Sequence, residues 1–436
     1  MKNTLERAVL LIAGCALFLR LMSVRIATAI ASQNLSRAPS TNETVNLIVT
    51  FILLTAAALF VIKLLLTKEA FPRTPIDIPI LVFFIAAALS YIYSADKSLT
   101  LRSLVILSGN IAIFYTLTGC LNSVYRARLF MMILVSAALV ASIIGLIHYF
   151  FIFDFVKQIG ADEKLPHLAR HMIDVKRIGS VFAWPNVLAG FLALIIPVSF
   201  VQIFSQERQA EKVIMALVTA TLVWAMFLTF SILCWLSLLT AGIICGYLFM
   251  DAGKAKRLAL PVFGLSALLF LLVILNRLDI FTLASAASRI KYLKSIFAMI
   301  KAHPVLGNGF DTFSWLLHIG YAKSPEGYAR YAHNSYLQIW AETGIAGFLS
   351  FLLIVGSVLN YGIRRLKKIT DYRNSVLLKG LLWAIMVFAI DNLSGFTILY
   401  PQTSVFWWVC AALMFSLVRN DNVAHPSAFA KASADT

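Results

Sequence analysis

Charged residues are scarce in this 436-residue sequence. Asp, Glu, Lys and Arg make up 13% of it, whereas 60% of the residues are hydrophobic and the mean hydropathy is +0.86. Soluble domains carry about 25% charged residues, so this composition excludes an ordinary soluble protein. Acids are the scarcer sign, with 20 Asp and Glu against 37 Lys and Arg. In a membrane protein such a balance indicates orienting cytoplasmic loops and contact with anionic membrane lipids, and we expect no nucleic-acid partner.

Patterns of cysteines and metal ligands are equally sparse. The sequence has neither H-E-x-x-H nor D-x-D, so we expect no metal and no cofactor. The first apolar stretch lacks a clear small-residue cleavage site, and we interpret it as a retained span. The few cysteines all fall in or beside apolar stretches, which is typical of small buried residues rather than of a disulfide framework. They are Cys15, Cys120, Cys234, Cys245 and Cys410.

Apolar stretches long enough to cross a bilayer recur along the chain. Because a spanning helix needs about 20 apolar residues, we predict an all-α, polytopic transmembrane helical bundle with about twelve spans. Residues 1–419 form a single membrane domain in this prediction, and residues 420–436 form a disordered polar tail. The predicted spans are 8–30, 47–66, 77–94, 99–120, 128–150, 184–204, 213–231, 233–250, 257–275, 343–362, 376–395 and 401–418.

Basic residues follow every second predicted span, as Lys68, Arg126 and Arg364 illustrate. Short cytoplasmic loops are enriched in Lys and Arg, so this pattern predicts that both termini are cytoplasmic. Two long loops, at about 151–183 and 276–342, then lie outside. They contain five of the seven histidines, namely His167, His171, His303, His318 and His333. We therefore expect the working surface of the protein in these external loops.

The second external loop contains a basic amphipathic segment, residues 288–301. Ile290, Leu293, Phe297 and Ile300 fall on one face of the predicted helix, which suits the level of the lipid headgroups. The helix either orients the protein at the surface or lets Arg289 reach inward to a phosphate group, for which the planar guanidinium is well suited.

Three further segments have compositions that suit binding. His303-Pro-Val-Leu-Gly-Asn-Gly-Phe310 predicts a tight turn whose backbone N–H groups are free to meet an anion. His333 and Asn334 precede a span, with Glu342 at its beginning. Asn186 follows Pro185, and both suit the start of a helix. Arg177, just before them, suits either a headgroup anchor or a phosphate ligand.

The ordered patterns R-x-G-S-x-F-x-x-P-N, R…H-P-x-x-G-x-G-x-x-x-F and H-N-x-x-L-Q…E-x-G-x-x-G-F span about residues 177–360. As a set they resemble the O-antigen ligase and O-antigen polymerase superfamily. The resemblance implies a metal-independent glycosyltransferase at the outer face of the bacterial cytoplasmic membrane. The implied donor is a polyprenyl-diphosphate-linked glycan, and the implied acceptor is a glycan or a lipid-linked sugar.

The resemblance also implies roles for individual residues. Arg177 and Arg289 are expected to hold the donor diphosphate, and His333 is expected to be catalytic. The expected substrate-binding residues further include Asn186, Asn334 and Glu342. One position departs from the family pattern. Many members carry Ser-Arg-Gly between the seventh and eighth spans, and here Ile232 stands in place of that arginine.

Two choices stay open at this point. A polymerase and a ligase differ in acceptor, and the motifs fit both. The alternative class is a membrane transporter of a small anion or solute. Coupled carriers usually place Asp or Glu inside their spans, whereas acids such as Asp77, Glu342 and Asp391 lie in loops or at span ends here. This distribution favours the transferase.

Overall fold

A computed structural model describes residues 2–30, 38–160, 167–182, 184–249, 264, 280–316 and 331–424. Within these residues the secondary structure is helical, and no strand occurs. The helices are α1 (Lys2–Ile30), α2 (Ala38–Thr67), α3 (Asp77–Leu89), the 3₁₀ helix η2 (Ser90–Tyr93), α4 (Lys97–Cys120), α5 (Val124–Ile147), the π helix η3 (His148–Ile152), α6 (Phe153–Gln158), α7 (His167–Asp174), α8 (Pro185–Ser205), α9 (Gln209–Phe227), α10 (Ile232–Phe249), α12 (Ile280–Ala302), α13 (Phe313–Leu316), α14 (Ser335–Leu366), α15 (Tyr372–Asp391) and α16 (Pro401–Ala424).

Nine helical segments of the described chain are long and apolar enough to cross a membrane. They confirm the predicted all-helical, multi-pass architecture. The apolar segment Asp77–Tyr93 is shorter, and the predicted span at 257–275 lies outside the described residues. The count of twelve therefore stays a prediction. The nine segments are Glu43–Thr67, Lys97–Cys120, Val124–Gln158, Pro185–Ser205, Gln209–Phe227, Ile232–Phe249, Ser335–Leu366, Tyr372–Asp391 and Pro401–Asp421.

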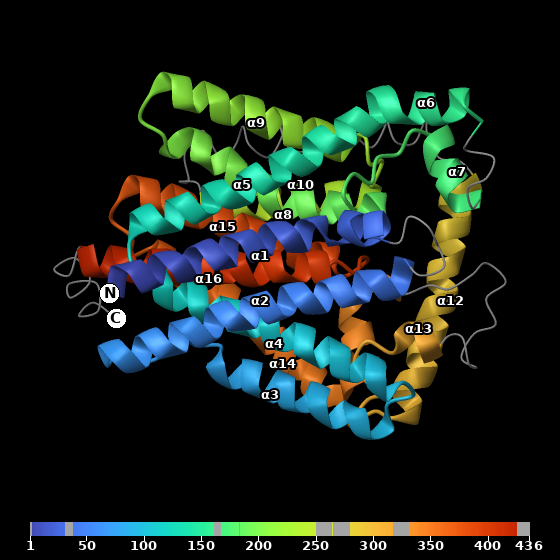
Figure 1. Ribbon diagram of the computed structural model, residues 1–436, viewed down its shortest axis with the longest axis horizontal. Coiled ribbons are helices and arrows are strands. Elements are labelled where there is room, and N and C mark those ends of the chain that lie inside the picture. The colour runs from blue at the N-terminus through green and yellow to red at the C-terminus, as the bar shows by residue number, and fades with distance from the viewer. Residues whose placement is uncertain are drawn as a thin grey trace.

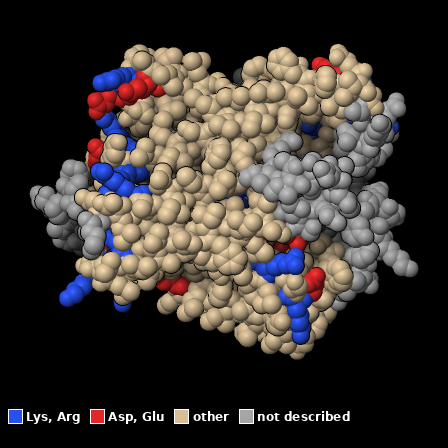
Figure 2. Space-filling model, in the orientation of Figure 1, with Lys and Arg blue, Asp and Glu red and all other residues tan. Residues whose placement is uncertain are grey.

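The long helices run roughly along one axis, and the start of α1 and the end of α16 lie at the same end of the bundle (Figure 1). Helices α6, α7, α12 and α13 gather at the opposite end, which we call the cap end, with α12 lying across it. On the face shown in Figure 2, charged side chains gather at the two ends and the middle is nearly free of them. Such a band of uncharged surface is what a bilayer requires.

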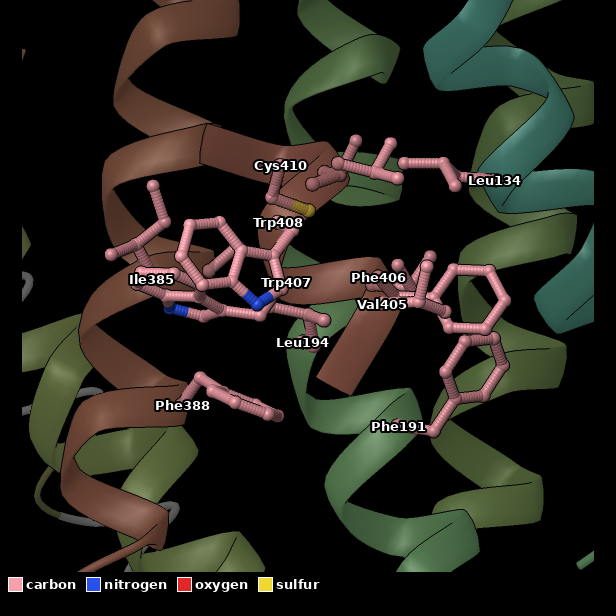
Figure 3. Packing of buried hydrophobic residues seen from close by; sticks show 14 of the residues in the cluster. Leu134, Phe191, Leu194, Ile385, Phe388, Val405, Phe406, Trp407, Trp408 and Cys410 are labelled. Carbon is pink, nitrogen blue, oxygen red and sulfur yellow. The ribbon is translucent and has the colours of Figure 1, made fainter. Parts of the chain in front are cut away.

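The centre of the bundle is formed by α8, α15 and α16. Phe191 of α8 meets Phe406 of α16 edge to face, with the ring centroids 4.8 Å apart. Trp407 is 1% exposed and lies near Leu194 and Phe388 (Figure 3). In lipid, helix association depends on such close packing because exposed side chains are already in an apolar solvent. This tightly packed centre carries the segments that form the cap end.

Helix α14 is broken near its beginning. Gly344 has φ 72° and ψ −176°, which separates an outer piece, 335–343, from a long piece, 345–366. The long piece begins close to the predicted span at 343–362. The loop between α12 and α13 fills the break, since Asn308 N donates to Ala341 O (3.0 Å) and Ile345 N donates to Pro304 O (3.0 Å). Backbone groups freed within a membrane protein need such partners.

The predicted amphipathic helix corresponds to part of α12, and protein covers only part of its predicted apolar face. Ile290 and Phe297 are 59% and 52% exposed, whereas Ile296 and Met299 are fully buried. The buried face is offset by about one residue because α12 packs this side against α14. Hydrophobic spacing alone did not distinguish the face toward protein from the face left open.

The last described helix overlaps the start of the predicted polar tail, residues 420–436. Helix α16 continues through Ala424. Asn420 Nδ2 donates to Leu121 O (2.8 Å), and Asn374 Nδ2 donates to the carboxylate of Asp421 (2.8 Å). These contacts hold Asn420 and Asp421 in the bundle, so the described helix extends past the predicted boundary at residue 419. Residues 425–436 lie outside the described residues.

Candidate functional site

Arg177 and Asn186 form one group at the cap end. Arg177 follows α7, and Asn186 lies in the first turn of α8. The guanidinium donates from Nη2 to Asn186 Oδ1 (3.0 Å) and from Nε to the carbonyl oxygen of Thr229 (2.9 Å). Ser231 Oγ donates to the same Asn186 oxygen (2.7 Å). The structure thus brings two predicted site residues together on the turn between α9 and α10.

Arg289 and His333 form a second group, although they are distant in the chain. Arg289 is half-buried, and its Nε has no hydrogen-bond partner among the described residues. His333 stacks on Tyr292, one turn after Arg289 on α12, with centroids 6.2 Å apart and an interplanar angle of 18°. The imidazole also meets Phe396 edge-on at 5.1 Å. One face of α12 therefore carries both Arg289 and Tyr292, the ring that stacks on His333.

The electrostatics of this second group are set by burial. Burial lowers the pKa of Arg289, and the nearby Cys234 and Asp391 act in the opposite direction. Burial, followed by the positive charge of Arg289, lowers the pKa of His333 to about 4. The imidazole is consequently neutral at pH 7 and able to accept a proton. His333 also adopts φ 57°, a left-handed conformation that is uncommon for a residue other than glycine.

Cys234 and Asp391 lie between the two groups. The Cys234 thiol donates to the backbone oxygen of Asn186 (3.9 Å), and both Arg177 and Arg289 act on it electrostatically. Asp391 Oδ2 accepts from Thr397 Oγ1 (3.0 Å), and its carboxylate acts electrostatically on Cys234. The buried Asp391 is thus a counter-charge for Arg289 in the interior of the site.

Asp391 was predicted only as an acid at a span end and not as part of the site. An acid at the end of a transmembrane helix is itself a functional signal, but its partner is visible only in three dimensions. Gly190 of α8 is part of the reason, because an added Cβ would lie 2.3 Å from Thr397 Cγ2 and 3.3 Å from Asp391 Oδ2. Because Gly190 has no side chain, the α15–α16 loop can pack closely against α8.

Asn334 lies next to His333, and its side chain caps α14. Its Oδ1 accepts from Leu337 N (3.0 Å). Side-chain capping of this kind satisfies one of the free donors at a helix N-terminus. The next residue, Ser335, bonds through Oγ to Asn392 Oδ1 (2.7 Å) and Gly395 O (3.1 Å). These contacts tie the start of α14 to the α15–α16 loop and so position His333.

Glu342 lies apart from both groups, beneath the loop between α12 and α13. It is fully buried. Its carboxylate accepts from Asp311 N (2.9 Å), Phe313 N (3.1 Å) and Gln338 Nε2 (2.9 Å). Three protein donors therefore occupy it, and a substrate would reach it only after this loop moved. Its expected contact with substrate stays a prediction.

The turn at 303–310 differs from its prediction. Its backbone N–H groups were expected to be free for an anion, and instead they bond to protein. Gly307 N donates to His303 O (3.0 Å), Gly309 N to Glu342 O (3.1 Å) and Phe310 N to Ser90 Oγ (3.0 Å). The two glycines serve close approach, since an added Cβ at Gly307 would lie 2.2 Å from Glu342 O. The motif packs against α14 and supplies hydrogen-bond partners to the backbone on both sides of the break at Gly344.

Metal ligands do not cluster in the part of the chain that the structure describes. No three His, Cys, Asp or Glu side chains come together there as a candidate metal site. The site is instead characterised by two guanidinium groups, one neutral imidazole and one buried carboxylate.

Comparison with known proteins identifies part of the chain. Residues 216–352 match the family model described as O-antigen ligase. The matched segment contains Arg289, His333, Asn334 and Glu342, whereas Arg177 and Asn186 precede it. A search of curated proteins found no match to the chain. The protein is therefore a helical membrane protein with an O-antigen ligase domain, which confirms the resemblance inferred from the motifs.

Proposed function

We propose that this protein transfers a glycan from a polyprenyl-diphosphate-linked donor to an acceptor sugar at the outer face of the bacterial cytoplasmic membrane. The match of residues 216–352 to the O-antigen ligase family supports the reaction class. In this proposal the cap end faces outward, both termini are cytoplasmic, and the reaction is that of a ligase or polymerase.

The observation that best supports the proposal is that Arg289 and His333 lie in the same group of residues. Both belong to the matched segment, and Arg289 acts electrostatically on the imidazole. A cation beside a neutral imidazole suits the departure of a diphosphate together with removal of a hydroxyl proton. In the proposed reaction Arg289 and Arg177 bind the diphosphate, because guanidinium forks match phosphate oxygens and neutralise the leaving group.

The proposed step conserves all atoms and charges. The acceptor hydroxyl oxygen forms a bond to the anomeric carbon of the donor sugar, and the bond from that carbon to the phosphate oxygen breaks. The polyprenyl diphosphate leaves with the electron pair, stabilised by the two guanidinium groups. His333 accepts the hydroxyl proton, a task for which a neutral imidazole is suited. Asp391 acts electrostatically on Arg289 from the interior side and compensates its charge when no donor is bound.

Asn186 and Asn334 support these groups in the proposal. Asn186 Oδ1 holds the Arg177 guanidinium through one of its N–H groups. Asn334 caps the helix that follows His333. Both are proposed to bind substrate through the arginine and histidine that they fix in place, with direct contact to the glycan as a further expectation.

A transfer assay tests the proposal. Purified protein in lipid nanodiscs would be given a synthetic polyprenyl-diphosphate-linked glycan and, in separate reactions, a lipid-linked sugar or a second donor molecule as acceptor. We expect a glycosylated product, identified by mass spectrometry, together with release of polyprenyl diphosphate. Lys294→Ala is the matched control, because Lys294 is an exposed cation of the same helix α12.

The comparison of variants decides the assignment. Product from wild type and Lys294→Ala, with little from Arg289→Ala, would support a specific cation at the site. Binding of donor without any product from either acceptor would overturn the transferase. Uptake of a labelled anion into sealed vesicles, in the absence of transfer, would favour the transporter instead.

A further inference from the structure

The hydroxyl of Thr397 joins two residues at the end of α15. Thr397 lies in the loop between α15 and α16 and is 3% exposed. Its Oγ1 donates to Asp391 Oδ2 (3.0 Å) and accepts from Asn392 Nδ2 (3.0 Å). A carboxylate offers only acceptors, an amide nitrogen offers only donors, and a hydroxyl offers both. One hydroxyl therefore connects the acid and the amide in a fixed direction.

The amide of Asn392 supports His333 from two sides. Its Oδ1 accepts from Ile398 N (3.0 Å), which closes the loop that holds Phe396 edge-on against the imidazole. The same oxygen accepts from Ser335 Oγ (2.7 Å), and Ser335 N donates to Asn392 O (3.0 Å). Ser335 is two residues after His333. Because a backbone N–H can only donate, the bond from Ile398 also fixes the orientation of the amide.

Asp391 is the other end of this hydrogen-bonded network. It acts electrostatically on Arg289, the cation that also acts on His333. The route from the counter-charge of the arginine to the support of the histidine thus contains one hydroxyl and one amide. Thr397, Asp391 and Asn392 are all nearly inaccessible to solvent. A polar group that loses its partner at such burial is costly, so removing one member also weakens the contacts of the others.

We infer that Thr397 is a positioning residue, whose hydroxyl links the counter-charge of Arg289 to the placement of His333. The part that this link plays in catalysis rests on the proposed function. A donor diphosphate bound at Arg289 and an acceptor hydroxyl facing His333 are then held in one geometry, because the same network supports both groups. Thr397 itself is buried and acts only through Asp391 and Asn392.

Chemical modification tests the link without any turnover. Diethyl pyrocarbonate carbethoxylates accessible neutral imidazoles, and peptide mass spectrometry reports each histidine separately. The reagent would be applied at neutral pH to the full-length protein in nanodiscs, without donor. Thr397→Val keeps a similar shape but lacks the hydroxyl, so His333 should react about 5- to 30-fold faster, the factor by which loss of a buried hydrogen bond shifts a local equilibrium. Thr397→Ser keeps the hydroxyl and should retain most of the protection.

Two comparisons make the result specific. His171 of α7 is the internal reference, and its reactivity should not change. Thr118→Val removes another buried hydroxyl, which donates to Phe114 O (2.8 Å) within α4, and it should leave His333 at the wild-type rate. An unchanged rate at His333 in Thr397→Val would overturn the link. An equal rise at His171 would indicate general loosening of the protein and would overturn it as well.

A pair of variants tests the connection to the counter-charge of Arg289. Asp391→Ala should raise the reactivity of His333 in the wild-type background. In the Thr397→Val background the same change should add little, because the hydroxyl that connects the acid to the histidine is already missing. If the effects on the logarithm of the rate added fully, the two residues would act independently and the link would be refuted.

The transfer assay then relates the link to the proposed reaction. Thr397→Val should lower kcat about 10- to 100-fold, because a displacement of about 1 Å can cost about 10² in rate. Donor affinity should change far less, since both arginines remain, and Thr397→Ser should restore most of kcat. A normal kcat in Thr397→Val would overturn the positioning role. The expected modification pattern in a protein that transfers no glycan would instead remove the proposed function and leave the link in place.

Discussion

Arg177 donates a hydrogen bond from its Nε to the carbonyl oxygen of Thr229 across 2.9 Å. The segment that follows α7 is thereby anchored on the turn between α9 and α10. This is the turn where Ile232 stands at the position for which the resemblance implies an arginine. Arg177 brings a guanidinium to that turn from another segment. The cap end therefore has a cation at this location although Ile232 is uncharged.

The two arginines are predicted to hold the donor together. Arg177→Ala and Arg289→Ala should each weaken donor binding about 10- to 100-fold, because a hydrogen bond to a charged group contributes about 1.5–3 kcal/mol. Lys at either position should restore only part of the affinity, since an ammonium loses the bidentate geometry. Binding of a fluorescent polyprenyl diphosphate, measured in nanodiscs, is the readout. Unchanged affinity in both Ala variants would remove the arginines from the site.

His333 is predicted to act on the acceptor and not on the donor. His333→Ala should lower the transfer rate by about 10²- to 10⁴-fold, the usual contribution of a general base. Donor affinity should persist because Arg177 and Arg289 remain. The control variant His171→Ala, which changes a histidine of α7, should transfer at the wild-type rate. Loss of both turnover and donor binding in His333→Ala would indicate that the histidine only holds the loop in place.

The pH dependence of transfer should change when donor binds. In the free protein the pKa of His333 is lowered to about 4, so kcat/KM should stay constant on acidification until the pH approaches that value. A bound diphosphate adds negative charge beside Arg289 and favours the protonated imidazole. The acid limb of kcat, which reports the complex, should therefore lie at higher pH than that of kcat/KM. Rates measured between about pH 3.5 and 8 would contradict this if both limbs coincided near 6.5, the ordinary histidine value.

Gly344 is predicted to be essential for the fold of the cap end. Its φ of 72° with ψ of −176° is strained for any other residue, and an added Cβ would lie 1.9 Å from Val305 O. Gly344→Ala should lose about 1–3 kcal/mol from backbone strain alone, with the clash in addition. Gly356→Ala, in the same helix, meets no atom within 4 Å and should gain up to about 1 kcal/mol. Thermal unfolding in detergent would compare them, and equal midpoints would refute the argument.

The proposed orientation can be measured at two described positions. In a background without the five native cysteines, Lys301→Cys at the end of α12 and Tyr372→Cys at the start of α15 would each be exposed. A membrane-impermeant thiol reagent applied from outside should label the first and not the second. Labelling of both from the same side would eliminate the proposed topology.

The spans were predictable from sequence because their signal is local. An apolar run of about 20 residues is nearly sufficient to indicate a spanning helix, and the predicted span at 184–204 corresponds closely to α8. The face of α12 was not predictable in this way. Ile290 and Ile296 are chemically alike, and only the packing of α14 decides that the second is buried while the first is exposed.

The candidate site was predictable in part, for a similar reason. Arg177, Arg289 and His333 belong to ordered motifs, and their types suit phosphate binding and proton transfer. Asp391 and Cys234 lie in ordinary span sequences, so their contacts with the site depend on how α10 and α15 pack. The turn at 303–310 was misread because glycines that expose N–H groups to an anion and glycines that permit close packing have the same sequence pattern.

The repaired break in α14 has a consequence for protein engineering. The loop at 304–313 and the helix ends on both sides of Gly344 satisfy one another's backbone groups, so neither has a complete set of partners alone. A chimera that exchanges either part with a relative would pair mismatched halves. The loop and both pieces of α14 next to Gly344, within residues 303–347, should therefore be transplanted together. A chimera joined at these boundaries should express and unfold cooperatively, whereas one joined between the loop and α14 should not, and equal yields of the two would show that the halves are exchangeable.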